Sequence, residues 1–348
     1  MDTNFNRIME FEEVLEVTEA YIKVKSKKTG KERFLRLIDL DKSDVRSKNQ
    51  IKAFIEKMKL EEDYKKNNRK GFVQIKRSIK EISGKLTQAR MHYFVKLLPL
   101  ISFQDIPLSL KGKPLSQTEI ANYIGASRKL TKALLDSLIE VEILVPVRLG
   151  KDNAFGYKMH GKYVIKGEFD EHEEYCVKIF QRNLSKFIKK IDEIVEKKNN
   201  DKRRKKKLEL YPLSLVAGLL PFVHPQAYIL CKNYHDDITK GYKDALTALE
   251  HNPKLIKKLT KKELWKAITG QTPKRMDGNQ REKLEMYFKI LKQANVLGSF
   301  EAENQIYFIN PSLVFVTTQV QNDEWYRSVR TLFGLAKEED NKNQKEKE

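Results

Sequence analysis

The residue types that usually perform enzyme chemistry are present in this sequence, but their spacing builds no recognisable catalytic or metal-binding site. The histidines are scattered, and Gly270–Lys274 lacks the spacing of a phosphate-binding loop. We interpret His235–Asp237 as a charged helix start rather than a metal site. The cysteines, Cys176 and Cys231, lie far apart and predict neither a metal site nor a disulfide framework. We therefore expect no enzyme activity, no metal and no cofactor.

Positive charge is the chemistry that this chain has in excess. It contains 68 Lys and Arg residues against 48 Asp and Glu residues, which gives a formal net charge of +20. Such an excess favours a polyanionic partner, because each cation that neutralises a phosphate releases condensed counterions. The alternative is a lysine-rich surface that only keeps the protein in solution.

The apolar stretches and the N-terminal residues predict the cellular location of the protein. The longest apolar stretch, near Leu215–Val223, contains Pro221 and is far shorter than the roughly 20 residues that a membrane-spanning helix needs. The first residues, MDTNFNRIMEFEEVLEV, are mixed and acidic, unlike a signal or transit peptide. We expect a cytoplasmic, nucleoid-associated bacterial protein with no membrane contact.

The strongest motif is a helix-turn-helix pattern after residue 115. Ser116 and Glu119 form a capping box that begins one helix, and Gly125 is suited to end it. Ser127 caps a second helix over Arg128–Ile139. The apolar residues that recur at helical spacing are Ile120, Ala121 and Ile124 in the first helix and Leu130, Ala133, Leu134 and Leu138 in the second.

A two-stranded hairpin is predicted directly after these helices. Residues 143–147 and 154–159 read as strands, joined by the polar and basic turn 148–153. A helix-turn-helix followed by such a wing predicts a winged helix, whose second helix can enter the DNA major groove. An Arg near the start of that helix could read guanine, and Thr131 could touch a base or a thymine methyl group. The candidate contacts are Ser127, Arg128, Lys129, Thr131, Lys132, Arg148 and Lys151. The alternative is a helical module that binds proteins.

An internal repeat predicts a second, diverged copy of this unit. Residues 97–101 match 219–223, residues 115–124 match 259–268, and residues 156–160 match 306–310, in the same order. The second capping box is Thr260 and Glu263, a longer turn follows from Thr269 to about Asn279, and the next helix has the apolar face Leu284, Tyr287, Phe288 and Leu291. Its candidate DNA contacts are Lys274, Arg275, Gln280, Arg281 and Lys283.

The second wing, residues 299–305, contains Glu301 and Glu303, which would repel phosphate. This copy is therefore expected either to bind DNA without its wing or to serve dimerisation or partner binding.

We predict an α+β, mainly helical fold with tandem winged helix-turn-helix domains and a small N-terminal β-hairpin. Residues 13–26 and 33–40 read as strands joined by a turn at Thr29-Gly30, and residues 46–68 read as a helix. The helical pattern from Glu173 to about Lys198 precedes the charged run 199–207. The predicted parts are 1–70, the N-terminal hairpin and helix; 71–172, the first winged helix domain; 173–207, a connecting helix and basic linker; 208–335, the second winged helix domain; and 336–348, a disordered tail.

Residues 72–101, 112–147 and 155–167 together resemble the replication proteins of small plasmids from Gram-positive bacteria, whose winged-helix relatives occur on phages and other mobile elements. The family often follows the wing with Asn-Pro; the second half has Asn310-Pro311, whereas the first has His160-Gly161. The resemblance covers 72–167 well, 208–316 loosely and 1–60 not at all. Tandem winged helices also occur in another class of plasmid initiators that bind direct repeats, an analogy of architecture only.

The resemblance implies double-stranded DNA binding and, more loosely, replication initiation at repeated origin sites on a plasmid or phage-like element. A second copy of the chain and the host replication or transcription machinery are further candidate partners. A transcription regulator of a mobile element and a winged-helix scaffold that binds proteins stay open as alternatives.

Overall fold

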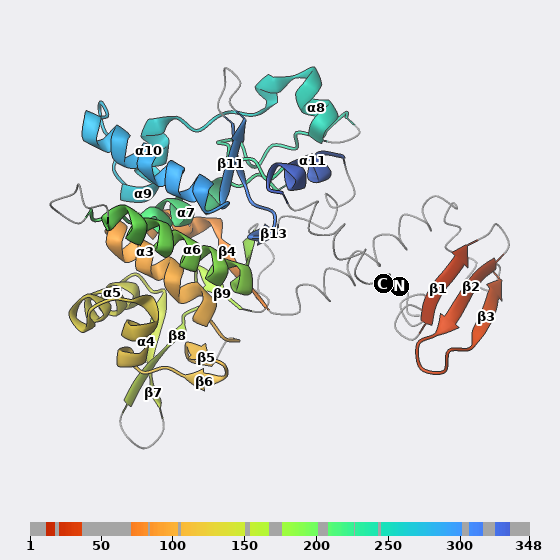
Figure 1. Ribbon diagram of the computed structural model, residues 1–348, viewed down its shortest axis with the longest axis horizontal. Helices are drawn as coiled ribbons and strands as arrows, with labels where there is room; N and C mark the ends of the chain where they lie inside the picture. Colours follow the sequence, from red (N-terminus) through yellow and green to blue (C-terminus); the bar gives the residue numbers. More distant parts are fainter. Residues whose placement is uncertain are drawn as a thin grey trace. The chain divides into compact units, whose positions relative to one another are not determined.

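The computed structural model describes residues 12–17, 21–36, 71–82, 84–103, 106–149, 154–166, 176–200, 208–225, 227–242, 245–300, 306–315 and 324–334. The chain forms two compact units, Met1–Arg69 and Lys70–Glu348 (Figure 1). The fold is α+β, with helices predominating over small sheets. The predicted helix 46–68, the basic run 201–207 and the tail 336–348 lie outside the described residues.

The N-terminal unit is a three-stranded antiparallel sheet rather than the expected hairpin. Its strands are β1 (Glu12–Val17), β2 (Tyr21–Ser26) and β3 (Glu32–Arg36), in the order β1-β2-β3. The predicted strand 13–26 folds back on itself, because Val14 pairs with Val24 and both side chains become buried. The turn between β2 and β3 is confirmed, with Gly30 at a φ of 70°.

A four-stranded sheet lies at the centre of the larger unit. Its middle strands are β4 (Phe72–Lys76) and β10 (Cys176–Phe180), flanked by β9 (Val164–Ile165) and β13 (Val314–Phe315), in the order β13-β10-β4-β9. Gln74 of β4 pairs with Lys178 of β10. On the outer sides, Gln74 also pairs with Ile165 of β9, and Lys178 also pairs with Phe315 of β13. The pairing is therefore symmetric about the middle of the sheet, with each half of the unit supplying two strands.

The prediction of an uninterrupted helix from Glu173 to Lys198 is wrong at its start. Residues 176–180 form β10, and only Gln181–Asn199 form a helix, α6. Val177 and Ile179 alternate toward the core, where their strand pairs with β4. Tertiary pairing has overridden the local helical spacing.

The first half continues from β4 through a fixed order of elements. These are η2 (Arg77–Ile82), α3 (Gln88–Leu97), η3 (Leu98–Leu100), β5 (Ser109–Leu110), β6 (Lys113–Pro114), α4 (Gln117–Ile124), α5 (Arg128–Glu140), β7 (Leu144–Leu149), β8 (Ala154–Met159) and β9.

The second half repeats this order from β10 with insertions. Its elements are α6, α7 (Pro212–Leu219), η4 (Leu220–Phe222), α8 (Ala245–His251), η5 (Pro253–Leu255), α9 (Lys261–Thr269), α10 (Gly278–Gln293), β11 (Leu297–Phe300), β12 (Ile306–Ile309), β13 and α11 (Glu324–Leu332). The internal repeat predicted from the sequence is thus present in the order of elements and in the pairing of the central sheet.

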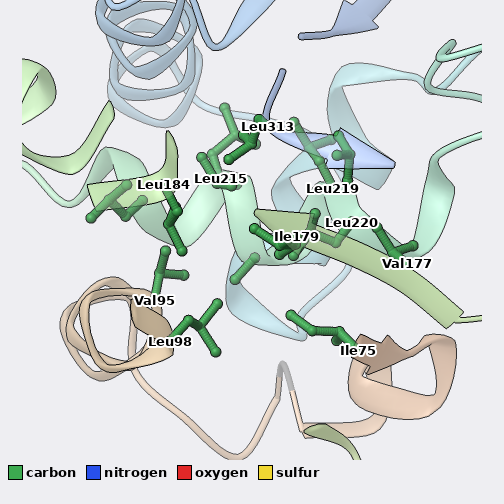
Figure 2. Packing of buried hydrophobic residues seen from close by; sticks show 14 of the residues in the cluster. Ile75, Val95, Leu98, Val177, Ile179, Leu184, Leu215, Leu219, Leu220 and Leu313 are labelled. Atoms are coloured by element: carbon green, nitrogen blue, oxygen red, sulfur yellow. The ribbon is translucent and has the colours of Figure 1, made fainter. Parts of the chain in front are cut away.

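One hydrophobic core joins the two halves. Helix α3 packs along α7, and Val95 and Leu98 of the first half lie in one cluster with Leu215 and Leu219 of the second (Figure 2). Close approach is needed where α7 crosses α9, because a Cβ on Gly218 would lie 2.5 Å from the carbonyl oxygen of Ala267. Residues 71–335, which the sequence divides into two winged helix domains and a connection, therefore belong to one compact unit, Lys70–Glu348. Among the described residues, no helix is long and apolar enough to cross a membrane.

Candidate nucleic-acid interface

Helix α4 begins and ends as its sequence predicts. The backbone N–H of Ser116 donates to Oε2 of Glu119 at 2.8 Å, and the N–H of Glu119 donates to Oγ of Ser116 at 3.4 Å, which completes the capping box. Hydrogen bonds from Ser116 and then Lys113 hold the pKa of the Glu119 carboxyl below its ordinary value. Gly125 ends the helix at a φ of 67°, in the left-handed region that glycine adopts freely.

Helix α5 follows after a tight turn and separates its apolar and charged faces. The Oγ of Ser127 accepts the N–H of Leu130 at 3.2 Å, so this predicted DNA contact also caps the helix. Leu134 and Leu138 are fully buried, as is Leu135, which the predicted face had omitted. The exposed residues include Arg128, Lys129, Lys132 and Asp136. The first turns of α5 therefore present three cations to solvent.

Thr131 corrects the predicted outer face of this helix. Its side chain is fully buried, and its Oγ1 has no hydrogen-bond partner among the described residues. The helical turn places it on the same side as Leu134 and Leu135, which face the core. The expectation that Thr131 is offered to a DNA base is therefore wrong in this structure.

The hairpin β7–β8 projects beyond α4 and α5 (Figure 1). Near its base, Tyr157 and Met159 are buried, and the hydroxyl of Tyr157 lies 3.5 Å from Oε1 of Gln117 on α4. Near its tip, the predicted contact Arg148 is exposed and pairs across the strands with Phe155. Lys151 lies outside the described residues. The structure thus places Arg148 near the outer end of a hairpin that is anchored at its base.

The second half has a corresponding pair of helices, α9 and α10, but the second helix of this pair begins differently from α5. The capping box of Thr260 and Glu263 is confirmed on α9. Helix α10 begins at Gly278, within the turn predicted to reach Asn279, and its N-cap is Asp277. The Oε1 of Gln280 accepts the Asp277 N–H at 3.2 Å, so this predicted DNA contact takes part in a capping box. The pattern Asp-x-x-Gln would have indicated this helix start.

The other predicted contacts in the second half differ in exposure. Lys274, Arg275 and Arg281 are exposed. Lys283 is half-buried, and its Nζ lies 5.9 Å from the ring centre of Tyr287. Burial lowers the pKa of Lys283. The exposed cations therefore gather before and at the start of α10.

Charge on the outer face of α10 differs from that on α5. Both helices lead into residues with left-handed φ, Glu142 at 59° and Asn295 at 64°. Counting back from this shared turn, Lys129 and Lys132 of α5 correspond to Glu282 and Glu285 of α10. Glu285 binds Nζ of Lys261 at 2.6 Å. The face that is cationic on α5 is thus mixed on α10.

A further helix covers one face of the second hairpin. Gly298 of β11 lies close to the side chains of Leu332, in α11, and Phe333, directly after it. Trp325 of α11 donates its indole N–H to the carbonyl of Ala227 at 2.9 Å. The predicted acidic tip, with Glu301 and Glu303, lies outside the described residues. The second hairpin is thus held by an element that has no counterpart among the described residues of the first half.

The scattered histidines and cysteines form no reactive cluster in the described part of the chain, where no group of three or more His, Cys, Asp or Glu residues could hold a metal ion. His235–Asp237 lie in turns, so the predicted helix start there is wrong. Burial raises the pKa of the Cys231 thiol to about 12, which keeps it protonated and unreactive at neutral pH. The exposed cations described on α5 and its hairpin are Arg128, Lys129, Lys132 and Arg148. Comparison with protein-family models, curated proteins and solved structures finds no match to this chain.

Proposed function

We propose that this protein binds double-stranded DNA at specific sites through tandem winged helix-turn-helix units, with α5 as the principal reading helix. The observation that carries the proposal is the exposed cationic start of α5, held by a capped turn beside a projecting hairpin. A helix of this kind can enter the major groove, and its rigid anchoring fixes which side chains reach the bases.

The exposed side chains divide between positioning and reading. Lys129 and Lys132 carry single positive charges that suit phosphate oxygens. Arg128 stands at the first helical position, where a planar guanidinium can donate two parallel hydrogen bonds to guanine. Arg148 on the hairpin can reach the backbone or the minor groove at the same time. Together these residues would supply both affinity and sequence preference.

The second half is proposed to contribute phosphate binding rather than base reading. Lys274, Arg275 and Arg281 are exposed before and at the start of α10. The two glutamates that replace lysines farther along that helix would repel the DNA backbone. Because the halves share one core, a contact by the second half would also fix the orientation of the first on the duplex.

The biological role that fits best is replication initiation on a plasmid or phage-like element. This role rests on the likeness of residues 72–167 to plasmid replication proteins, together with the duplicated helix-turn-helix units that could address repeated sites. Regulation of transcription on such an element would use the same surface at a promoter, and the two roles differ in where the protein binds.

The test is a footprint of the full chain across its own gene and flanking DNA. Several evenly spaced protected sites would support the initiator role, whereas one site over a promoter would support the regulator. Protection nowhere, with only salt-sensitive coating of any DNA, would contradict specific recognition.

A paired variant tests the assignment of α5. Replacing Lys129 and Lys132 by Ala should weaken binding and reduce the slope of log affinity against log salt by about 2, since each lost phosphate contact is worth about 0.9. Replacing Lys240 and Lys254 by Ala removes the same charge from exposed positions outside α5 and its hairpin, and should leave the slope nearly unchanged. Equal effects of the two double variants would show that net charge, not α5, governs binding.

A further inference from the structure

An exposed aromatic ring stands at the outer end of the hairpin β7–β8. Along one face of β8, Met159 and Tyr157 are each 8% exposed, but the next residue on that face, Phe155, is 53% exposed. The strand therefore leaves the core between Tyr157 and Phe155. In the described part of the chain, no aromatic ring or cation lies against the ring of Phe155.

Backbone pairing places the Phe155 side chain on the same face of the hairpin as that of a cation, Arg148. Phe155 pairs with Arg148 across the hairpin, so both side chains leave the same face of the ribbon. Side chains directly opposite each other in an antiparallel pair have Cβ atoms about 5 Å apart. An exposed Phe and an exposed Arg therefore project together, away from the buried base of the hairpin.

The opposite face of the hairpin is packed in a way that stiffens its outer end. A Cβ on Gly156 would lie within 2.8 to 3.0 Å of the side chain of Leu149, so the leucine side chain closely covers the glycine backbone. Strand pairing continues to the outermost pair, Leu149 and Ala154. The ribbon is thus regular up to the point where Phe155 and Arg148 emerge.

We propose that Phe155 is a wedge residue that presses against a base step in the minor groove, while Arg148 binds in the same groove. The proposal rests on the DNA-binding function proposed above. Apolar side chains that enter the minor groove partly unstack a base step, and narrow minor grooves attract Arg because their negative potential is enhanced.

The wedge predicts an affinity loss without a change in salt dependence. Phe155→Ala removes no charge, so the slope of log affinity against log salt should stay as in the wild type. Affinity for the footprinted site should fall roughly five- to a hundredfold, the range found for loss of one base-stacking aromatic. Phe155→Trp, which keeps a large ring, should retain most of the affinity.

The matched control is Phe103→Ala. Phe103 is 61% exposed in the loop after η3, and Nζ of Lys166 lies 5.2 Å from its ring centre. This substitution removes a similarly exposed ring without touching the hairpin, and DNA affinity should be unchanged.

The experiment uses the full chain and a duplex that carries its protected site, with 2-aminopurine replacing adenine at TA steps beside the protected major groove. Wild type and Phe155→Trp should raise the 2-aminopurine fluorescence on binding, and Phe155→Ala should not. A Phe155→Ala protein that equals the wild type in affinity and fluorescence would overturn the wedge alone. A wild type that binds the protected duplex without raising the fluorescence would also overturn the wedge alone. If the footprint shows no protected site at all, the DNA-binding proposal fails and the wedge fails with it.

Discussion

Arg77 and Gln181 hold equivalent places in the two halves of the larger unit, and each hydrogen-bonds the backbone of the other half. Arg77 directly follows β4, and its guanidinium donates to the carbonyl of Val223 at 2.7 Å, just after η4. Gln181 directly follows β10, and its amide donates to the carbonyls of Leu98 at 2.9 Å and Ile101 at 2.8 Å, around η3. Each half therefore donates to buried carbonyls in or directly after the short helix of the other half.

Because Arg77 and Gln181 each bond the other half, we expect that removing either side chain destabilises the larger unit. Gln181→Ala leaves the carbonyls of Leu98 and Ile101 without that donor and should lower the free energy of unfolding by about 2–3 kcal/mol. Arg77→Ala should cost a similar amount or more, because its guanidinium also lies 3.8 Å from the ring centre of Tyr234. Urea unfolding followed by tryptophan fluorescence reports on this unit, which contains both Trp265 and Trp325.

The control for this exchange is Arg182→Ala, which truncates the exposed neighbour of Gln181. It should change the free energy of unfolding by less than about 0.5 kcal/mol. A Gln181→Ala protein as stable as this control would show that the hydrogen bonds of Gln181 to the other half do not stabilise the fold.

Gly218 predicts a second large loss, at the crossing of α7 and α9. In Gly218→Ala the new Cβ would lie 2.5 Å from the backbone oxygen of Ala267, which no side-chain rotation can relieve. We expect a loss of about 3 kcal/mol in the free energy of unfolding. Gly278→Ala is the control, because a Cβ there would meet no atom of the described residues within 4 Å. It should be neutral or stabilising by up to about 1 kcal/mol.

Thr131 offers a substitution that separates stability from DNA contact. Thr131→Val replaces a buried hydroxyl, which has no hydrogen-bond partner in the described part of the chain, with a methyl group of similar size. The free energy of unfolding should rise by about 1 kcal/mol, with DNA affinity unchanged. Thr131→Ser keeps the hydroxyl, loses the methyl group and should destabilise the protein. A drop in site-specific DNA affinity for Thr131→Val at unchanged stability would instead place this residue at the bases.

The buried His92 predicts a fall in stability as the pH falls below about 6.5. Its Nδ1 accepts the backbone N–H of Leu213 at 3.3 Å, and burial, then Lys96, hold its pKa well below the ordinary 6.5. Burial also lowers the pKa of His224. The unfolded chain takes up protons at these histidines while the folded protein does not. Stability is therefore full above pH 6.5 and is lost below it, by up to about 1.4 kcal/mol per pH unit for each histidine.

The measurement is the free energy of unfolding between pH 5 and pH 7.5. His92→Asn keeps a hydrogen-bond acceptor near the Nδ1 position but cannot ionise, so the pH dependence below 6.5 should become shallower. His235→Asn changes an exposed histidine and should keep the wild-type slope. A His92→Asn slope equal to that of the wild type would show that His92 does not control this transition.

Local features of this chain were predictable from sequence, because they depend on residues within one helical turn. The capping boxes at Ser116 and Thr260, the stop at Gly125 and the cap at Ser127 were all found where the sequence placed them. Each arises from hydrogen bonds between residues at most a few positions apart, so their spacing is visible without a fold.

Long-range packing decided the rest. Residues 176–180 are a strand because β4 lies beside them, and Val14 and Val24 bury each other because the N-terminal strand turns back. Thr131 is buried because the core surrounds that side of α5, although its polar type suggested an outward position. These outcomes depend on partners far away in sequence, whose positions no local spacing specifies, so only the tertiary structure determined them.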